Sequence, residues 1–420
     1  MTSVREINQL ARVEGHGRVQ LMQQDGRVVG ARLELYESLR LFEALVVGRR
    51  FDELPEIVCR ICSICSTVHK VAALQAVETG LGIVASPQTV LLRQLAVQGG
   101  QIESHALHLY CLALPDYLGC GGFPGLARLV PTELHQGLSI KALGNRIQEL
   151  VGGRAIHPFN LLLGGLGTVP TAEQLAQLAD ELLAIQGAAL ATVELVAGLQ
   201  ESLPLLPALP GCAVTGGPSL FGDRLTTTDG QQVAAAGAHT WLDEQLTSYS
   251  HAKLSNFGGK GPYLAGPLAR LNLAIPCEPA AQAALHRFNT RIINGTLSAS
   301  HLARAIELVQ AIERSGRLID ELLQNGIRPE QPVIPEQFAG SATALIEAPR
   351  GLLLHQYTFD GDGRCTGAQV VTPTAINQAA MAASLTSLVD RLAGNSVSEV
   401  KVQAERLVRC FDPCISCAVH

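Results

Sequence analysis

The chain lacks any concentration of charge of one sign. Its 420 residues include 31 Lys and Arg against 37 Asp and Glu, which gives a formal net charge of −6, and no long run of either sign occurs. Nucleic acids and anionic membranes are bound by basic patches or stripes. We therefore expect neither a nucleic acid nor an anionic membrane among the partners of this chain.

The sequence also shows no pattern of a targeting signal or a membrane span. The first residues, MTSVREINQLARVEGHGRV, carry no basic stretch followed by an apolar one, as a secretory signal would. Gly, Pro, His and Asn interrupt the uncharged stretches 155–172 and 203–222, so neither forms the roughly 20-residue apolar helix that crosses a bilayer. With 11 cysteines and no such signal, we expect no transmembrane segment and a reducing location, the cytoplasm, unless a partner exports the chain.

The apolar pattern predicts a mainly α fold with a small antiparallel sheet at the start. Short alternating runs on either side of Asp25-Gly26 indicate a hairpin within about residues 4–36. Capping residues and helical spacing predict long helices over 86–115, 171–203 and 298–323. The segment 204–266, rich in Gly, Pro and Thr, should form loops with short strands. Because no repeat or low-complexity stretch divides the chain, we expect one domain over 1–420.

Two C-x2-C pairs carry the clearest chemical signal. Cys62 and Cys65 form the first, and Cys414 and Cys417 form the second, close to the final His420. A two-residue gap lets both sulfurs face one ion, as in zinc and iron–sulfur sites. The first pair lies at a predicted helix start, which favours thiolate over thiol. Together the pairs permit a four-thiolate site that joins the chain end to the N-terminal third.

The same spacing fits two kinds of metal site. A structural zinc site can use four thiolates, but its ligands usually come from one short segment, whereas these pairs lie near opposite ends of the chain. Nearby carboxylates and arginines suit a redox-active nickel or iron centre better, because proton transfer needs titratable groups at hand. A zinc-stabilised interaction subunit remains the alternative.

The motifs around these pairs occur in a familiar order. The chain resembles the large subunits of nickel–iron hydrogenases in RVEGH (12–16), R-x-C-x-x-C with His69 (60–69), EAPRG (347–351) and DPC-x-x-C-x-x-H (412–420). Further matching segments are SHALHLYCLALPDY (104–117), GGRAIHPFNLLLGG (152–165) and YLAGPLARLN (263–272). Ser63 stands where many members of the family have glycine. In this serine and in its modest length, the chain resembles the cytoplasmic branches of the family that couple hydrogen to pyridine nucleotides or to electron-bifurcating partners.

The resemblance implies a multihelical large-subunit fold around a nickel–iron centre. Cys62 and Cys414 would be terminal ligands of nickel, and Cys65 and Cys417 would bridge nickel to an iron that also holds carbon monoxide and cyanide. Pro373 and Thr374 match positions that line the cyanide pocket. A magnesium site is implied as well, and its ligands would be Glu43, His420 and the carbonyl of Val370.

The resemblance also assigns catalytic roles. Arg350 would lie over the open metal position, held by Asp116 and Asp412, while Glu14 would pass protons from a nickel thiolate. Four thiolates and two cyanides on two divalent metals leave a charge of about −2, so a buried guanidinium is needed close by. Arg350 suits this role best, with Arg60 and Arg409 flanking the cysteine motifs. His69 is expected to hydrogen bond to the site, and His105 and His108 to pack within their helix.

The implied activity is the interconversion of hydrogen with two protons and two electrons. The cysteines Cys111, Cys120, Cys212, Cys277 and Cys365 show no paired spacing, so we expect no iron–sulfur cluster in this chain and an iron–sulfur small subunit as partner. Flavin and NAD(P) or bifurcating sites would lie on further subunits, because no G-x-G-x-x-G occurs in a strand-to-helix context. A hydrogen sensor with the same centre is an alternative, whereas the related quinone-reductase subunits lack the cysteine pairs.

Overall fold

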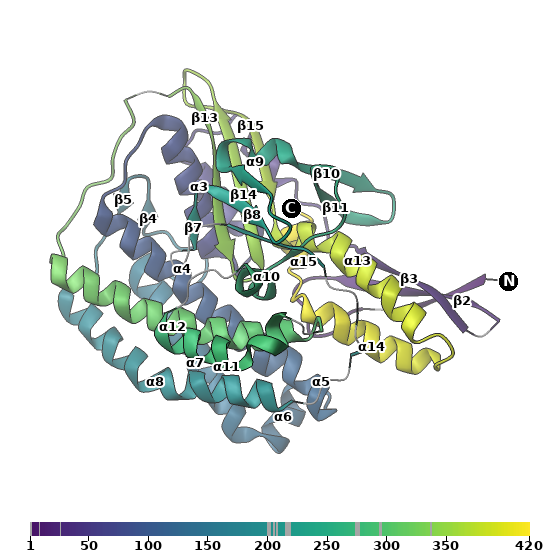
Figure 1. Ribbon diagram of the computed structural model, residues 1–420. Coiled ribbons are helices and arrows are strands. Elements are labelled where there is room, and N and C mark those ends of the chain that lie inside the picture. Colours follow the sequence, from purple (N-terminus) through teal and green to yellow (C-terminus); the bar gives the residue numbers. More distant parts are fainter. Residues whose placement is uncertain are drawn as a thin grey trace.

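A three-stranded antiparallel sheet opens the chain, as the sequence predicts. The computed structural model describes residues 2–7, 9–25, 27–199, 203–204, 206, 209–214, 220–273, 278–293, 296–336 and 338–420. Strands β1 (Thr2–Ile7), β2 (Gly17–Gln24) and β3 (Arg27–Leu35) pair in that order. Alternate residues of β2, including Val19 and Leu21, are buried. Figure 1 shows β2 and β3 extending away from the main body toward the N-terminus.

Long helices form a layer at the lower left of Figure 1, away from this sheet. They are α4 (Pro87–Leu107), α7 (Pro131–Gly152), α8 (Ala172–Gly198) and α12 (Ala299–Asn325), and Figure 1 shows them side by side. The predicted capping box is present, because the Thr171 side chain accepts from the backbone N–H of Gln174 and the Gln174 side chain returns the bond. The shorter helices beside them are α6 (Phe123–Leu129), α10 (Pro267–Asn272) and α11 (Pro279–Ile293).

The helix predicted to stop at Pro115 continues past it. After α4 the chain forms a π-helix, η2 (His108–Ala113), and then α5 (Leu114–Leu118), which contains Pro115. Proline is tolerated there because the first turn of a helix has no partner for its N–H. The expectation of a stop at Pro115 was therefore wrong, and the wide turn of η2 places His108 in the core.

Helices α4 and α7 approach closely at Gly99 and Gly144. A Cβ built on Gly144 would lie 2.5 Å from the Glu103 backbone nitrogen and 2.6 Å from the Gly99 oxygen. We expect Gly144→Ala to push the helices apart and lower the free energy of unfolding by about 1–3 kcal/mol. The control Gly187→Ala in α8 meets no atom within 4 Å and should raise it by up to about 1 kcal/mol. Urea denaturation measures both, and equal midpoints would contradict the close packing.

Helix α8 is long and apolar enough to cross a membrane by length and composition alone, and 28% of its most apolar window is buried. Its buried side chains include Leu175, Leu178 and Leu182, and the helix packs against α12 and α7. A helix with one apolar stripe turned toward neighbouring helices is typical of a globular core. The absence of a transmembrane segment stays a prediction.

A buried antiparallel sheet was missed by the sequence analysis. It consists of β13 (Gly340–Ala348), β14 (Gly351–Phe359), β15 (Cys365–Val371) and the short β7 (Phe221–Gly222), in the order β15-β14-β13-β7. Seven of the nine residues of β14 are buried, so its sequence shows no alternation of apolar and polar residues. Helix α3 (Ser66–Leu81) packs against β13 and β14.

The described part of the segment 204–266 contains the short strands that the sequence predicts, together with a longer hairpin. Strands β6 (Gly211–Val214), β8 (Arg224–Thr227), β9 (Gln232–Ala234) and β12 (Leu264–Ala265) form one small sheet. A separate hairpin pairs β10 (Leu242–Thr247) with β11 (Ser250–Phe257), and α9 (Ala235–Trp241) lies before it. The short strands of this segment were therefore predicted, whereas α9 and the longer hairpin were not.

The C-terminal segment returns to the centre of the molecule. Helices α13 (Pro373–Arg391) and α14 (Val397–Cys410) lead to α15 (Ile415–Ala418), and Val419 and His420 are both buried. Figure 1 shows this terminus beside α13 and the central sheet. The remaining short elements are α1 (Phe42–Val46), α2 (Leu54–Val58), η1 (Cys59–Ile61), β4 (Leu161–Leu162) and β5 (Gly165–Leu166).

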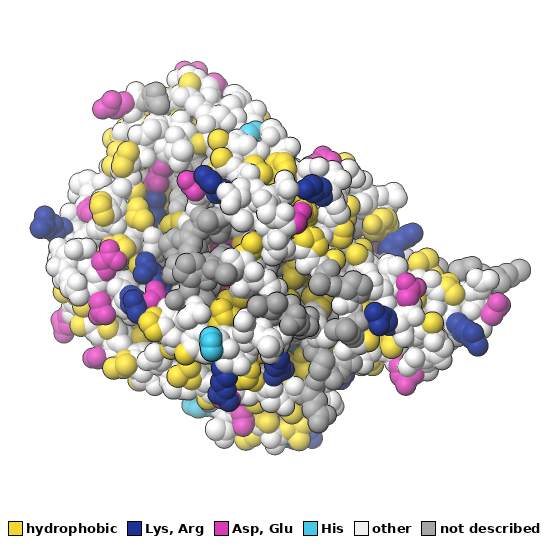
Figure 2. All heavy atoms as spheres, in the orientation of Figure 1, with side chains coloured by type: hydrophobic (Ala, Val, Ile, Leu, Met, Phe, Trp, Pro, Cys, Tyr) yellow, Lys and Arg dark blue, Asp and Glu magenta, His cyan; other side chains and the backbone are white. Residues whose placement is uncertain are grey.

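The face drawn in Figure 2 carries acidic and basic side chains scattered singly among other residues. This distribution agrees with the near balance of charge in the sequence. It forms no basic stripe of the kind that binds a phosphate backbone on that face.

Candidate metal centre

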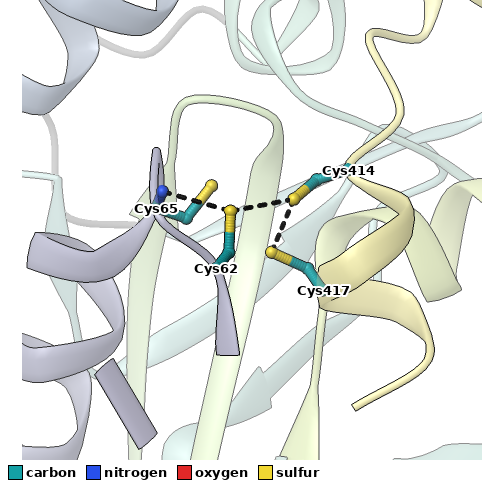
Figure 3. Close-up of side chains that lie close together, drawn as sticks. All are labelled: Cys62, Cys65, Cys414 and Cys417. Carbon is teal, nitrogen blue, oxygen red and sulfur yellow. Dashed lines mark hydrogen bonds between the residues drawn. The ribbon is translucent and has the colours of Figure 1, made fainter. Parts of the chain in front are cut away.

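The four cysteines of the two C-x2-C pairs meet at one buried point. Their sulfur atoms all lie within 4.8 Å of one another, and Cys62, Cys65, Cys414 and Cys417 are each at most 4% exposed. The Sγ of Cys414 lies 3.3 Å from that of Cys62 and 2.7 Å from that of Cys417. Figure 3 shows the first pair and the second pair approaching from opposite sides. Among the described residues this is the one group with the arrangement of a metal site.

Local backbone geometry turns each pair inward. Cys62 is extended and Cys65 is the N-cap of α3, so the Cys65 N–H lies 3.4 Å from the Cys62 sulfur. On the other side Cys414 is the N-cap of α15, and Cys417 lies one turn later. Each pair therefore places both sulfurs at the start of a helix, where free backbone N–H groups favour negative charge.

The RVEGH motif holds the second pair in place. The carbonyl of Glu14 accepts from the N–H of Ile415, and its Oε2 accepts from the N–H of Ser416, both at 3.0 Å. Gly15 has a φ of +82°, and a Cβ there would lie 2.8 Å from the Ile415 side chain. The glycine of the motif is therefore required by the close approach of the C-terminal turn.

Arg350 provides the positive charge nearest the sulfurs. Its Nη1 donates to the Cys65 Sγ at 3.3 Å, and Arg350 is 2% exposed. Hydrogen bonds from Cys414 and Cys417, together with this guanidinium, lower the pKa of the Cys65 thiol. Burial instead raises the pKa of Cys414 and Cys417 well above the usual value. Without a metal the group therefore keeps some protons, and binding a metal would release them.

Asp412 fixes the orientation of Arg350, as the resemblance implies. The Arg350 Nε donates to the Asp412 carbonyl at 2.8 Å, and Nη2 donates to its carboxylate at 3.2 Å. The Nδ1 of His108 lies 2.9 Å from the same carboxylate. Burial opposes ionisation of Asp412, but Arg350 and His108 lower its pKa below the usual range. His108 is buried as expected, and its ring also reaches this carboxylate, which the sequence did not indicate.

Asp116 does not hold Arg350 in the structure. Its carboxylate accepts from Arg12 and from Arg409, at 2.6 Å from the Arg409 Nε, and its carbonyl accepts from Arg406. Asp116 therefore ties the RVEGH loop to α14, one layer away from the sulfurs. Arg409 already pairs with Asp116, and Arg60 is exposed. Of the three arginines considered from the sequence, Arg350 is therefore the one with a described hydrogen bond to a cysteine sulfur.

His69 lies beside the cysteines, as predicted. Its Nε2 is 3.6 Å from the Cys417 Sγ, and its Nδ1 is 3.0 Å from Nε2 of His355. The Nδ1 of His355 is in turn 2.7 Å from the Tyr357 hydroxyl. Burial lowers the pKa of His69 to about 3 and that of His355 well below its usual value, so burial disfavours the charged form of both rings. His355 and Tyr357 were missed because β14 itself was not predicted.

A second polar group surrounds the last residue. The Nδ1 of His420 donates to the Cys417 carbonyl at 2.6 Å, which leaves Nε2 as the ring nitrogen that could face a metal. That Nε2 is buried, has no hydrogen-bond partner among the described residues and lies 3.8 Å from Oε1 of Glu43. Burial would raise the pKa of Glu43, but contacts with His420 and Lys253 lower it to about 2. A bare imidazole nitrogen beside a carboxylate fits a divalent cation.

Lys253 occupies part of the same group. Its Nζ donates to Glu43 at 2.6 Å and to Glu244 at 3.1 Å. The backbone N–H of Val370, rather than its carbonyl, contacts Glu43, at 2.8 Å. Lys253 and Glu244 lie on β11 and β10, so sequence spacing gave no sign that they would join Glu43.

Thr374 lies against the second cysteine pair. The Thr374 Oγ1 accepts from the Cys414 N–H at 2.9 Å, and Pro373 starts α13 behind the N-cap Thr372. Because the hydroxyl oxygen is the acceptor in this bond, its own proton is free to donate to another group.

Of the cysteines that the sequence places outside the centre, Cys277 lies outside the described residues.

The family comparison agrees with these motifs. Residues 40–120 and 223–420 match the family model described as nickel-dependent hydrogenase. The matched ranges include both C-x2-C pairs, Arg350 and the residues around His420.

Relatives and solved structures match over nearly the whole chain. Sulfhydrogenase 2 subunit alpha of Pyrococcus furiosus is 36% identical and covers 99% of this chain and 98% of its own length. NAD-reducing hydrogenase HoxS subunit beta of Cupriavidus necator is 30% identical over 99% of this chain and 94% of its own. A crystal structure of an NAD+-reducing NiFe hydrogenase in the H2-reduced state superposes with a TM-score of 0.89, at 28% identity, over 100% of this chain and 99% of that one.

Proposed function

Since the chain belongs to the nickel-dependent hydrogenase family, as a catalytic subunit, we propose that it interconverts hydrogen with two protons and two electrons at a nickel–iron centre. The observation that carries this proposal is the buried group of Cys62, Cys65, Cys414 and Cys417 with the Arg350 guanidinium on one sulfur. Four thiolates on zinc would also leave a charge of about −2, so it is the family match rather than the charge that favours a hydrogenase centre over a structural zinc site.

The cysteines divide into two roles. Cys62 and Cys414 are the terminal nickel ligands in this proposal, and Cys65 and Cys417 bridge nickel to iron. Their soft sulfur donors suit both metals. When bound, the metal pair supplies a Lewis acid and a redox partner for the two electrons of hydrogen.

Proton movement falls to residues in contact with these cysteines. The Arg350 guanidinium touches Cys65, and Asp412 holds its orientation through two contacts. The Glu14 carboxylate lies at the backbone of the second pair, on its Ser416 N–H, and is the group that we propose carries protons toward the interior. Asp116 supports the loop of Glu14 through Arg12 rather than acting on Arg350.

Carbon monoxide and cyanide on the iron would complete the centre. We assign the cyanide pocket to Pro373 and Thr374, because the Thr374 hydroxyl has a proton left to donate after accepting from the Cys414 N–H. A hydroxyl donor is what the nitrogen end of a bound cyanide needs.

We propose a magnesium ion at Glu43, the Val370 carbonyl and His420. The unpartnered Nε2 of His420 supports this assignment. His420→Gln should reduce magnesium to well below one ion per chain, whereas the control His286→Gln, on an exposed part of α11, should leave it unchanged. Elemental analysis of the purified proteins measures the difference, and a full magnesium content in His420→Gln would contradict the site.

Electrons would leave through an iron–sulfur small subunit. Two exposed apolar side chains near the centre support this partner: Leu39 is 51% accessible and Leu41 is 57% accessible. Arg40 lies between them, and its guanidinium donates to the carbonyls of Ile61 and Ser416 beside the cysteines. Exposed apolar side chains next to a functional centre suit a protein interface.

The proposed electron acceptor is a module that carries flavin and NAD(P) or bifurcates electrons, by analogy with the NAD-reducing relative. We assign the assembly to the cytoplasm. The single domain over 1–420 also stays a proposal.

Isotope exchange tests the activity without assuming an acceptor. The purified complex, incubated with D2 in ordinary water, should release HD and H2, because cleavage of the bond at the centre exchanges deuterons with solvent protons. A metal-loaded complex that neither exchanges nor consumes hydrogen would contradict an enzyme and favour a sensor.

A further inference from the structure

A line of three hydrogen-bonding side chains leads from Cys417 into the central sheet. His69 contacts the Cys417 sulfur at 3.6 Å, His355 contacts His69 at 3.0 Å, and Tyr357 contacts His355 at 2.7 Å. The exposed fractions of His69, His355 and Tyr357 are 1%, 0% and 0%. Bulk solvent therefore does not determine where the protons of these side chains lie.

The sheet fixes the geometry of this line. His355 and Tyr357 are two residues apart in β14, so their side chains point to the same face, and α3 with His69 packs against that strand. The rings of His69 and His355 meet edge to face, with centroids 5.3 Å apart. The ring of Tyr357 also packs against Phe359, so it cannot turn away without disturbing the sheet.

The protons along this line can be arranged in only two ways. A neutral imidazole has one N–H donor and one acceptor nitrogen. If Tyr357 donates to Nδ1 of His355, then His355 donates from Nε2 to His69, and His69 donates from Nε2 to the Cys417 sulfur. If His355 carries its proton on Nδ1, the order reverses and a lone pair of His69 faces the sulfur.

The structure favours the first arrangement at both ends. At one end, the Tyr357 hydroxyl has His355 as its hydrogen-bond partner among the described residues, so in the reversed order its proton would be buried without an acceptor. At the other end, binding a metal would release the Cys417 proton, and the resulting thiolate attracts an N–H and repels a lone pair.

We propose that Tyr357 and His355 are positioning residues that fix the tautomer of His69, so that its Nε2–H donates to the Cys417 thiolate. The bond would withdraw electron density from the Cys417 sulfur. The other proposed bridging sulfur, that of Cys65, accepts a hydrogen bond from Arg350 instead. This inference rests on the proposed function, because it concerns the electron density that Cys417 gives to the metals.

Infrared spectroscopy of a Tyr357→Phe variant tests the proposal. The substitution removes one hydroxyl, after which His355 and His69 can populate both tautomers, so the carbon monoxide and cyanide bands should shift to lower wavenumber with an unchanged metal content. The control Tyr110→Phe removes another buried hydroxyl, bonded to Thr192 and Gln136, and should leave the bands in place. Unshifted bands in Tyr357→Phe, or equal shifts in both variants, would overturn the role of Tyr357.

Neutron diffraction on the unmodified, deuterium-exchanged holoenzyme gives a second test that does not require a variant to fold. Deuterium should lie on Nε2 of both His69 and His355, and on the Tyr357 oxygen directed at His355. Deuterium on Nδ1 of His69 would overturn the inference while leaving the hydrogenase assignment intact. Absence of carbon monoxide and cyanide bands in the unmodified protein would instead contradict the proposed function.

Discussion

Cys414→Ser and Cys62→Ser should each abolish both nickel retention and hydrogen turnover. Each sulfur belongs to one buried group with no spare donor of the same kind among the described residues. A serine oxygen is harder than sulfur and stays protonated at neutral pH, so it does not replace a thiolate on a soft metal. Removing a residue that only supports a ligand already costs about 10–100-fold in metal affinity, so loss of a ligand should cost more than about 100-fold.

Metal analysis and hydrogen uptake with an artificial dye measure this effect. The control Cys120→Ser changes a partly exposed cysteine outside the centre and should retain nickel and turnover. A fully active Cys62→Ser or Cys414→Ser protein with its nickel in place would exclude the four-cysteine centre as the site of reaction.

Arg350→Lys should leave the metals bound and reduce turnover sharply. Arg350 makes three directed contacts, one to the Cys65 sulfur and two to Asp412, and a single ammonium cannot reproduce this fork. The charge that compensates the centre is kept, so assembly should survive. Loss of one preorganised donor at a reacting centre typically costs about 10²–10³-fold in kcat, and we expect a loss of that order.

The matched control is Arg60→Lys, an exposed arginine two residues before Cys62. Its turnover should stay within a factor of about 2 of the unmodified enzyme, since exposed substitutions away from a site have small effects. Steady-state hydrogen oxidation by both variants, normalised to nickel content, gives the comparison. If Arg350→Lys turns over as fast as Arg60→Lys, the guanidinium has no part in the reaction.

The residues of the metal centre were predictable where they lie in short motifs. The two C-x2-C pairs indicate thiolate ligands by spacing alone, and the resemblance placed Arg350 and Asp412 next to them before any geometry was known. The position of His69 one turn after Cys65 follows from helical periodicity, and the structure places it on the Cys417 sulfur.

Contacts that depend on tertiary packing could not be read from the sequence. Asp116 lies in a matching motif, yet its partners are Arg12 and Arg409, because α14 brings an arginine to it that no local pattern indicates. His355 was invisible because β14 is buried on both faces and therefore lacks the alternation that marks a strand. The contact of His108 with Asp412 joins residues far apart in the sequence, so no local pattern indicates it.

The helical layer was predicted more closely than the sheets. Capping residues such as Ser86 and Thr171 act within one turn of the chain, and their signals place the starts of α4 and α8 correctly. Strand pairing joins residues far apart in sequence, as β13 does with β7, so its partners cannot be identified from local pattern.

Infrared spectroscopy of the unmodified protein, purified without oxygen and analysed for metals in the same sample, tests the central claim most directly. The proposed centre, formed by the four cysteines with iron-bound carbon monoxide and cyanide, predicts one carbon monoxide band and two cyanide bands together with about one nickel per chain. A spectrum without these bands, from a protein that holds stoichiometric zinc, would contradict it.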